Sequence, residues 1–164
     1  VQTCALPIFE ATVEVNNQRK KQMAQRVIEA AGGDLKGRKV AVLGVAFKAN
    51  TDDMRDSPAI DIVAALQEAG ANIHAYDPAA MHEAAKLMPN VTWGTDTYNV
   101  LDNADAAVII TEWNEFRGLD LDRAREVMRT PALIDLRNIY DPAQVAAAGF
   151  SYTSVGRPAA AATE

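Results

Sequence analysis

The sequence contains a single cysteine, so an internal disulfide cannot form, and a reducing cytoplasm is the expected location. It also contains no apolar run near the roughly 18 residues that a membrane-spanning helix needs. Basic residues are outnumbered, with 16 lysines and arginines against 22 aspartates and glutamates and a net charge of −6. Proteins that bind nucleic acid through its phosphates concentrate lysine and arginine. We therefore exclude nucleic acid and anionic membrane surfaces as partners.

The N-terminal segment lacks the features of a secretion signal. Residues 1–15 contain neither a basic n-region nor a long apolar h-region. The sequence also begins with valine rather than methionine, so we expect it to be part of a longer protein. Its 164 residues are typical of one domain, and a hydrophobic content of 49% is enough for a sizeable core.

The pattern of apolar residues predicts a long helix followed by alternating strands and helices. Residues 9–31 have helical spacing, and Gly32-Gly33 end the helix because glycine readily adopts the left-handed C-cap conformation. Strands are expected at 38–47, 72–78, 91–94, 105–113, 132–138 and 150–156, and helices at 58–70, 81–88, 97–104 and 121–128. This alternation is typical of βαβ units, so we expect a Rossmann-like three-layer sandwich with a mostly parallel sheet.

Glycine is scarce where a nucleotide-binding domain usually places its phosphate loop. The segment GVAFKANTDDMRDSP, residues 44–58, directly follows the first strong apolar run, yet it lacks the G-x-G-x-x-G fingerprint of dinucleotide-binding domains. Instead it carries two cations, Lys48 and Arg55, and it ends with Ser57 as the N-cap of a helix that starts at Pro58. Free N–H groups at a helix N-terminus favour an anion. Lys48 is therefore either a ligand-binding residue or a solvated loop residue.

The carboxyl ends of the expected strands carry most of the unusual polar residues. Ligands of parallel α/β sheets bind beyond these ends, at one edge of the sheet. The rule selects four segments, which are residues 47–55, 76–78, 111–116 and 136–142. We expect the binding site to be built from them.

Arg137 lies at the carboxyl end of the expected strand 132–138. Arginine forms bidentate contacts with phosphate and carboxylate groups, and the neighbouring Asn138 can supply an amide. The alternative is an ion pair between Arg137 and either Asp135 or Asp141. Cations at the ends of two parallel strands, here an arginine and the lysine of the glycine-poor loop, favour a diphosphate-binding site.

Three further residues are candidates for chemistry. Asp52 and Asp53 could hold a metal, but carboxylates just before a helix N-terminus also stabilise its dipole and can pair with Arg55. No second cluster of histidine and carboxylate residues accompanies them, so we prefer the structural interpretation. A lone cysteine can be a nucleophile, yet Cys4 has no activating histidine, lysine or arginine nearby in the sequence. We therefore expect neither a metal site nor a catalytic cysteine.

Several of these motifs together resemble one known family. The segment GVAFKANTDDMRDSPA, followed by AYDP, TEWNEF and LIDLRNIYDP, resembles the C-terminal domain of the UDP-glucose/GDP-mannose dehydrogenase family. The earlier segment VEVNNQRKKQMAQRV resembles the family's long central helix, which forms much of its dimer interface. The resemblance covers about residues 11–157. Each motif is weak alone, whereas their combination is specific.

The resemblance implies a function and a set of site residues. Members of the family oxidise a nucleotide-sugar alcohol to a carboxylate in two successive NAD-dependent steps, and the C-terminal domain holds the nucleotide of the substrate. The glycine-poor loop is then expected to receive a uridine diphosphate. Phe47 and Lys48 match the pair that contacts the nucleotide-sugar, and Arg137 matches the substrate-binding arginine. Arg55 matches the arginine that reaches across to NAD.

The sequence also departs from the family's pattern. The family's catalytic cysteine lies in a Gly-Gly-Ser-Cys-Phe-Pro-Lys-Asp motif well upstream of the central helix, so Cys4 does not match it. The N-terminal Rossmann domain that holds NAD is absent. The resemblance divides the chain into an unmatched segment, a central dimerisation helix, a UDP-sugar-binding α/β domain and a flexible tail, at residues 1–8, 9–33, 34–157 and 158–164.

The implied partners are UDP-glucose, the NAD-binding domain of the same chain and a second copy bound through the central helix. The residues of the segments ANTDDMRDSPA and TEWNEF favour glucose as the sugar. The alternatives are a sibling enzyme that acts on a UDP-N-acetyl-hexosamine or on GDP-mannose, and a stand-alone nucleotide-binding or dimerisation module without catalysis. By itself, the chain is expected to be inactive.

Overall fold

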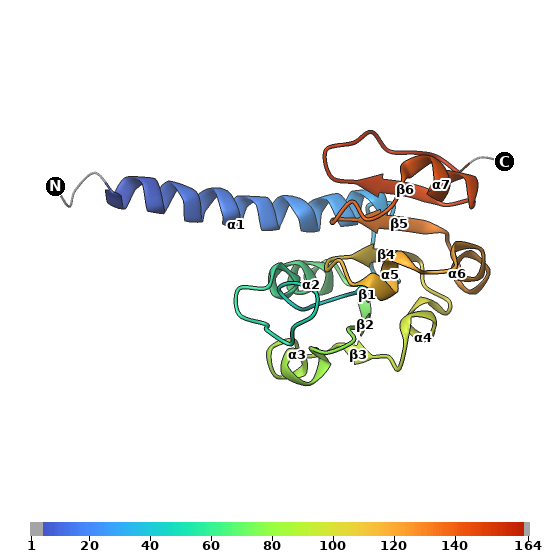
Figure 1. Ribbon diagram of the computed structural model, residues 1–164, viewed down its shortest axis with the longest axis horizontal. Helices are drawn as coiled ribbons and strands as arrows, with labels where there is room; N and C mark the ends of the chain where they lie inside the picture. Colours follow the sequence, from blue (N-terminus) through green and yellow to red (C-terminus); the bar gives the residue numbers. More distant parts are fainter. Residues whose placement is uncertain (1–4, 163–164) are drawn as a thin grey trace.

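A computed structural model describes residues 5–162, with side chains from residue 9 onward. Its centre is a six-stranded sheet in the order β3-β2-β1-β4-β5-β6, and each neighbouring pair is parallel (Figure 1). The strands are β1 (Lys39–Leu43), β2 (Asn72–Tyr76), β3 (Thr92–Trp93), β4 (Ala106–Ile109), β5 (Ala132–Asp135) and β6 (Ser151–Ser154). The predicted α/β class is confirmed.

Helices cover both faces of the sheet and give three layers (Figure 1). One face carries α1, α2 and α3, and the other carries α4, α6 and α7, while α5 is a short turn of helix directly after β4. The helices are α1 (Ala5–Ala30), α2 (Pro58–Glu68), α3 (Met81–Leu87), α4 (Thr97–Leu101), α5 (Asn114–Arg117), α6 (Leu121–Val127) and α7 (Pro142–Ala147). Within residues 5–162, no helix combines the length and the hydropathy that crossing a bilayer requires.

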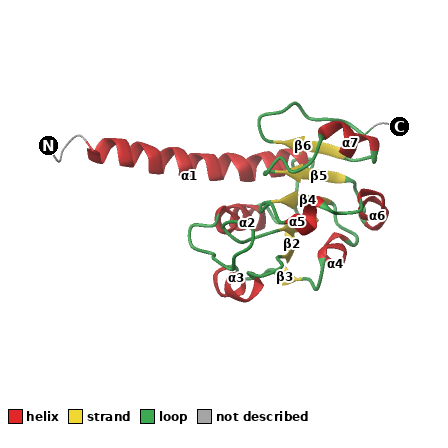
Figure 2. Ribbon diagram, in the orientation of Figure 1, coloured by secondary structure: helices red, strands yellow, loops and turns green. Residues whose placement is uncertain are grey.

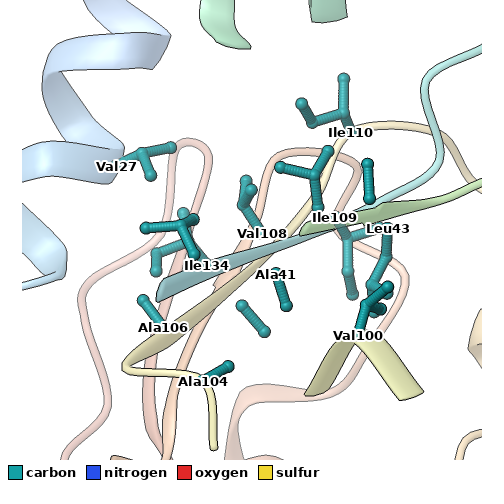
Figure 3. Close-up of a cluster of buried hydrophobic side chains, with 14 of the residues drawn as sticks. Val27, Ala41, Leu43, Val100, Ala104, Ala106, Val108, Ile109, Ile110 and Ile134 are labelled. Atoms are coloured by element: carbon teal, nitrogen blue, oxygen red, sulfur yellow. The ribbon is translucent and has the colours of Figure 1, made fainter. Parts of the chain in front are cut away.

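The hydrophobic core lies on both sides of the central strands. All of β4 and nearly all of β1 are buried, as expected for continuous apolar strands that are covered on two faces. Figure 3 shows part of this core, where Val27 of α1 and Val100 of α4 lie near strand residues that include Ala41 and Val108. Side chains from α1 and α4 thus contribute to the core on the two faces of the sheet.

The long helix α1 packs through only part of its length. Ala24, Val27 and Ala31 are buried at its C-terminal end, whereas residues 9–19 are exposed and project beyond the α/β body (Figure 1). The helix also begins earlier than the predicted residue 9. Pro7 does not interrupt it, because proline is tolerated in the first turn of a helix.

The first strand is shorter than predicted and ends at Leu43. Gly44 turns the chain with a φ of +81°, and a Cβ atom at this position would lie 2.6 Å from the Cβ of Thr111. Val45 and Ala46 are buried loop residues rather than strand residues. The apolar run therefore marked burial correctly, but the predicted strand is wrong over residues 44–47.

Two helices were not predicted, and the C-terminal segment is more ordered than expected. The short helices α5 and α7 follow β4 and β5, and α7 is capped by the side chain of Asp141. Beyond β6, the main-chain groups of Ala160 and Tyr152 hydrogen-bond to each other in both directions. This pairing holds the first part of the expected flexible tail against the sheet.

Candidate functional site

The strand order identifies the carboxyl edge between β1 and β4 as the candidate binding site. The chain runs outward from β1 in one direction and then returns to β4 on its other side, so the two strands form a topological switch point. Ligands of doubly wound sheets bind at such points. Figure 2 shows the long loop after β1 and the loop after β6 on the side of the body from which α1 projects. The four segments selected from the sequence meet along this edge.

The loop after β1, residues 44–57, presents the predicted pair Phe47 and Lys48 to solvent. The amide of Phe47 donates to the carbonyl of Asp53 at 2.8 Å, which closes the loop on itself. The Phe47 ring is 49% exposed although it is large and apolar. Lys48 is exposed too, and among residues 5–162 it forms no ion pair or side-chain hydrogen bond. Both side chains are therefore available to a ligand.

A buried carboxylate, Asp77 at the end of β2, holds the start of this loop. Asp77 is 0% exposed and accepts hydrogen bonds from four main-chain amides and one indole. The donors are Val45 N, Ala46 N, Ala79 N, Ala80 N and Trp113 Nε1. One side chain thus joins the carboxyl ends of β1, β2 and β4.

Two hydroxyl groups fasten the same loop from either side. Ser57, the predicted N-cap of α2, accepts from the amide of Ala59 and donates to the carbonyl of Val45 at 2.6 Å. Thr111, just after β4, donates to the carbonyl of Ala46 at 2.6 Å. The main chain at 44–46 is therefore fixed, while the following residues remain at the surface.

The predicted cofactor contact, Arg55, is engaged with a neighbour. Its Nε and Nη2 atoms donate to the two carboxylate oxygens of Asp53 at 3.0 and 2.8 Å. The hydrogen bonds and charge of Arg55 lower the pKa of Asp53 to about 2. The sequence had left open whether an aspartate of this loop pairs with the arginine, and Asp53 does so. The arginine side chain is still 90% exposed, so its remaining edge faces solvent.

Arg137 lies just after β5, and its partner is not the one expected. Its Nε atom is 2.5 Å from Oε2 of Glu112. Glu112 follows β4, the strand that pairs with β5. The predicted alternatives were Asp135 and Asp141. Asp135 instead accepts from the main-chain amide of Arg137 at 2.9 Å, and Asp141 caps a helix. The arginine side chain is 41% exposed.

The loop that carries Arg137 is fixed by a second buried carboxylate. Asp135 is 0% exposed and also accepts from the amides of Ile139 and Tyr140 and from the hydroxyl of Tyr152. Burial, together with the hydrogen bond to Asp135, raises the pKa of the Tyr152 hydroxyl, which therefore stays protonated as a donor. The side-chain amide of Asn138 is not free to bind a ligand. Both of its amide atoms bond to the main chain of Val155.

The described N-terminal half of α1 forms a wall beside the β1 loop. A groove of about 490 Å³ lies between them, lined by α1 residues from Val13 to Met23 and by Phe47, Asp56 and Pro58. Lys20 crosses from α1 to Asp61 on α2 with an ion pair of 2.8 Å. Phe47, one of the two residues predicted to contact the nucleotide-sugar, therefore lines a groove.

Comparison with known proteins agrees with this geometry. The model of the UDP-glucose/GDP-mannose dehydrogenase family, UDP binding domain, matches residues 41–142. The chain belongs to this family. The matched range starts within β1, ends at the beginning of α7 and includes each strand-end segment described above.

Relatives within the family are similar over most of this chain. The UDP-glucose 6-dehydrogenase of Rhizobium meliloti (strain 1021) is 57% identical over 151 residues, which are 92% of this chain and 35% of that protein. The structure of a UDP-glucose dehydrogenase from the hyperthermophilic archaeon Pyrobaculum islandicum is similar with a TM-score of 0.66 and 35% identity, over 77% of this chain and 28% of that one. An NDP-N-acetyl-D-galactosaminuronic acid dehydrogenase from Methanosarcina mazei Go1 has a TM-score of 0.71 and 29% identity, over 85% and 29% of the two chains. The present chain spans about a third of the length of the curated relatives it matches.

The candidate site contains residues that were not predicted from the sequence. Asp77 follows β2 and Asp135 ends β5; each accepts hydrogen bonds from the loop after it, while Glu112 pairs with the predicted arginine. The position of an acidic residue at the end of a predicted strand was the available signal for the first two. Glu112 could not be found in this way, because its partner Arg137 follows a different strand. Cys4 lies outside the described residues.

Proposed function

We propose that this chain is the nucleotide-sugar-binding part of a UDP-glucose 6-dehydrogenase, an enzyme that oxidises UDP-glucose to UDP-glucuronate with two NAD. The uridine diphosphate binds at the carboxyl edge of the sheet. Lys48 and Arg137 contact its phosphates, and the exposed ring of Phe47 packs against the nucleotide-sugar. A cytoplasmic location suits this chemistry, since the substrate and the cofactor are both intracellular metabolites.

The arrangement of the two cations carries the proposal. Lys48 follows β1 and Arg137 follows β5, with only β4 between them. Neighbouring strands lie about 4.8 Å apart, so the two strand ends are separated by about 10 Å, a span that two long cationic side chains can close around a diphosphate. The lysine forms no ion pair among the described side chains, and the arginine contacts its partner through one nitrogen. Basic groups left this free in an acidic protein are suited to an anionic ligand.

NAD does not fit the loop after β1. In dinucleotide-binding domains, the main-chain N–H groups at this position approach the pyrophosphate. Here the amides of Val45 and Ala46 donate instead to the carboxylate of Asp77. The relatives are longer than this chain and have room for an N-terminal domain, and we assign NAD binding to that domain. Arg55 would contact the cofactor from across the cleft. A second copy would bind through α1, where Phe9 and Val15 are exposed.

A different sugar is the main alternative, because one similar structure is a dehydrogenase of an N-acetylated nucleotide-sugar. A stand-alone module without catalysis is the other. The uridine diphosphate site is common to the UDP-sugar alternatives, so the base and diphosphate are the parts that this chain can test by itself.

Titration of the chain with UDP, ADP and GDP tests the proposal. We expect millimolar binding of UDP and weaker binding of the purine nucleotides. Loss of a charge-assisted hydrogen bond removes about 1.5–3 kcal/mol, so Lys48→Ala and Arg137→Ala should each weaken UDP binding about tenfold or more. Lys36→Ala is the matched control, since Lys36 is an exposed lysine before β1 at the opposite edge of the sheet. Equal or absent binding of the three nucleotides would exclude a uridine site.

A further inference from the structure

We propose that Glu112 positions Arg137, holding the guanidinium by its Nε edge so that the two terminal Nη groups face the diphosphate of the ligand. This inference rests on the proposed function. Glu112 touches the arginine rather than the ligand, so it is a positioning residue and not itself a binding residue.

The contact geometry is one-sided. Oε2 of Glu112 lies 2.5 Å from Nε of Arg137, and the structure of residues 5–162 shows no other ion pair or side-chain hydrogen bond for this arginine. A guanidinium has five N–H donors in a planar fork, of which Nε carries one. The two Nη groups with the remaining four donors are thus available on the side away from Glu112. This is the edge that binds a phosphate in bidentate fashion.

Glu112 is held by its immediate neighbours. The Thr111 hydroxyl donates to the carbonyl of Ala46 on the β1 loop, and the Trp113 indole donates to the buried Asp77. Both flanking side chains are buried. The main chain of Glu112 is therefore held on both sides, by the hydrogen bonds of Thr111 and Trp113. Arg137 is fixed at its own main chain by Asp135, so both ends of the ion pair start from rigid positions.

A purely structural role explains this pair poorly. The side chains are 28% and 41% exposed, and ion pairs at such positions add little to stability. Oε2 is enclosed, and among the described residues its close contact is with Nε of Arg137. Burial alone would raise the pKa of Glu112, but the interaction with Arg137 outweighs it and the pKa is lowered. The glutamate is then charged at neutral pH.

Glu112 also opposes the ligand, because a carboxylate repels a diphosphate. The alternative to positioning is therefore competition, in which Glu112 occupies the arginine until the ligand displaces it. The two roles predict opposite results. Under positioning, removal of the carboxylate weakens ligand binding, since a free arginine must be ordered when the ligand arrives. Under competition, the same change strengthens binding.

The test is a double-mutant cycle read by NMR titration of the chain with UDP, a method suited to millimolar dissociation constants. We expect Glu112→Ala to raise the Kd about tenfold and Glu112→Gln to raise it less, because glutamine keeps an acceptor oxygen. In an Arg137→Lys background, Glu112→Ala should have no further effect, since lysine has no Nε edge to be held. Glu126→Gln is the matched control. Glu126 is an exposed glutamate on α6, outside the four strand-end segments.

Each outcome is decisive once thermal unfolding has verified that the variants are folded. Unchanged or tighter binding by Glu112→Ala overturns the inference, and so does an effect of undiminished size in the Arg137→Lys background. If Arg137→Ala weakens binding while Glu112→Ala does not, the proposed function stands and the positioning role falls. If the unsubstituted chain binds no UDP at all, both fall together.

Discussion

Replacing Asp77 with asparagine should destabilise the fold more than any other change that preserves side-chain volume near the site. The carboxylate accepts from Val45, Ala46 and the Trp113 indole through Oδ2, and from Ala79 and Ala80 through Oδ1. An asparagine amide offers only one acceptor oxygen, and its NH₂ group would face donors in either orientation. The less costly orientation turns the NH₂ group toward Ala79 and Ala80, which leaves both of these amides without an acceptor.

The magnitude follows from these lost acceptors. A buried donor left unsatisfied costs about 1–3 kcal/mol, so two of them cost about 2–6 kcal/mol. Domains of this size have a free energy of unfolding of about 5–15 kcal/mol, so the loss is a large fraction of the total. Urea unfolding of the two proteins measures the difference directly. Hydrogen exchange of the Ala79 and Ala80 amides adds a local readout, because these amides lose their acceptor and their protection should fall further than the global stability does.

Asp96→Asn is the matched control for this experiment. Asp96 is exposed and caps α4 by accepting from the amide of Asn99, a role that asparagine fills equally well. We expect its free energy of unfolding to change by less than about 0.5 kcal/mol. If Asp77→Asn proves as mild as Asp96→Asn, the buried carboxylate does not hold the strand ends together, and the account of the β1 loop fails.

The sequence was sufficient for the fold class, and it predicted Lys48 and Arg137 as candidate binding residues at strand ends. Buried parallel strands read as continuous apolar runs, and helices between them carry local caps such as Ser57, so the alternation could be recognised without tertiary information. Lys48 and Arg137 were identified because each follows such a run directly. Both signals depend on residues that are close together in the chain.

The remainder of the site depends on contacts between distant segments. Glu112 and Arg137 come from adjacent strands, and sequence spacing carries no information on which charged residues at neighbouring strand ends will meet. The same limit applies to strand length. The apolar run after Lys39 continues through Ala46, but the turn at Gly44 is set by its close approach to Thr111, which follows β4.

Two further predictions concern the loop after β1. Under the proposed function, Arg55→Ala in the intact dehydrogenase should raise KM for NAD about ten- to a hundredfold more than KM for UDP-glucose. The same substitution should raise the pKa of Asp53 from about 2 toward its ordinary 3.8 in an NMR titration. In the unsubstituted chain, the lowered pKa of Asp53 favours the folded state above pH 3.8, and this stabilisation is lost as pH falls through about 2. Equal effects on the two substrates would rule out the cofactor contact. Gly44→Ala should lower the free energy of unfolding by about 2–5 kcal/mol, since the positive φ costs about 1–2 kcal/mol and the contact with Thr111 adds overpacking of about 1–3 kcal/mol. Gly156→Ala has a similar φ of +71° with no heavy atom within 4 Å of the new Cβ, so it should cost only the first of these amounts, and equal losses in the two variants would show that the close approach to Thr111 is not what ends β1.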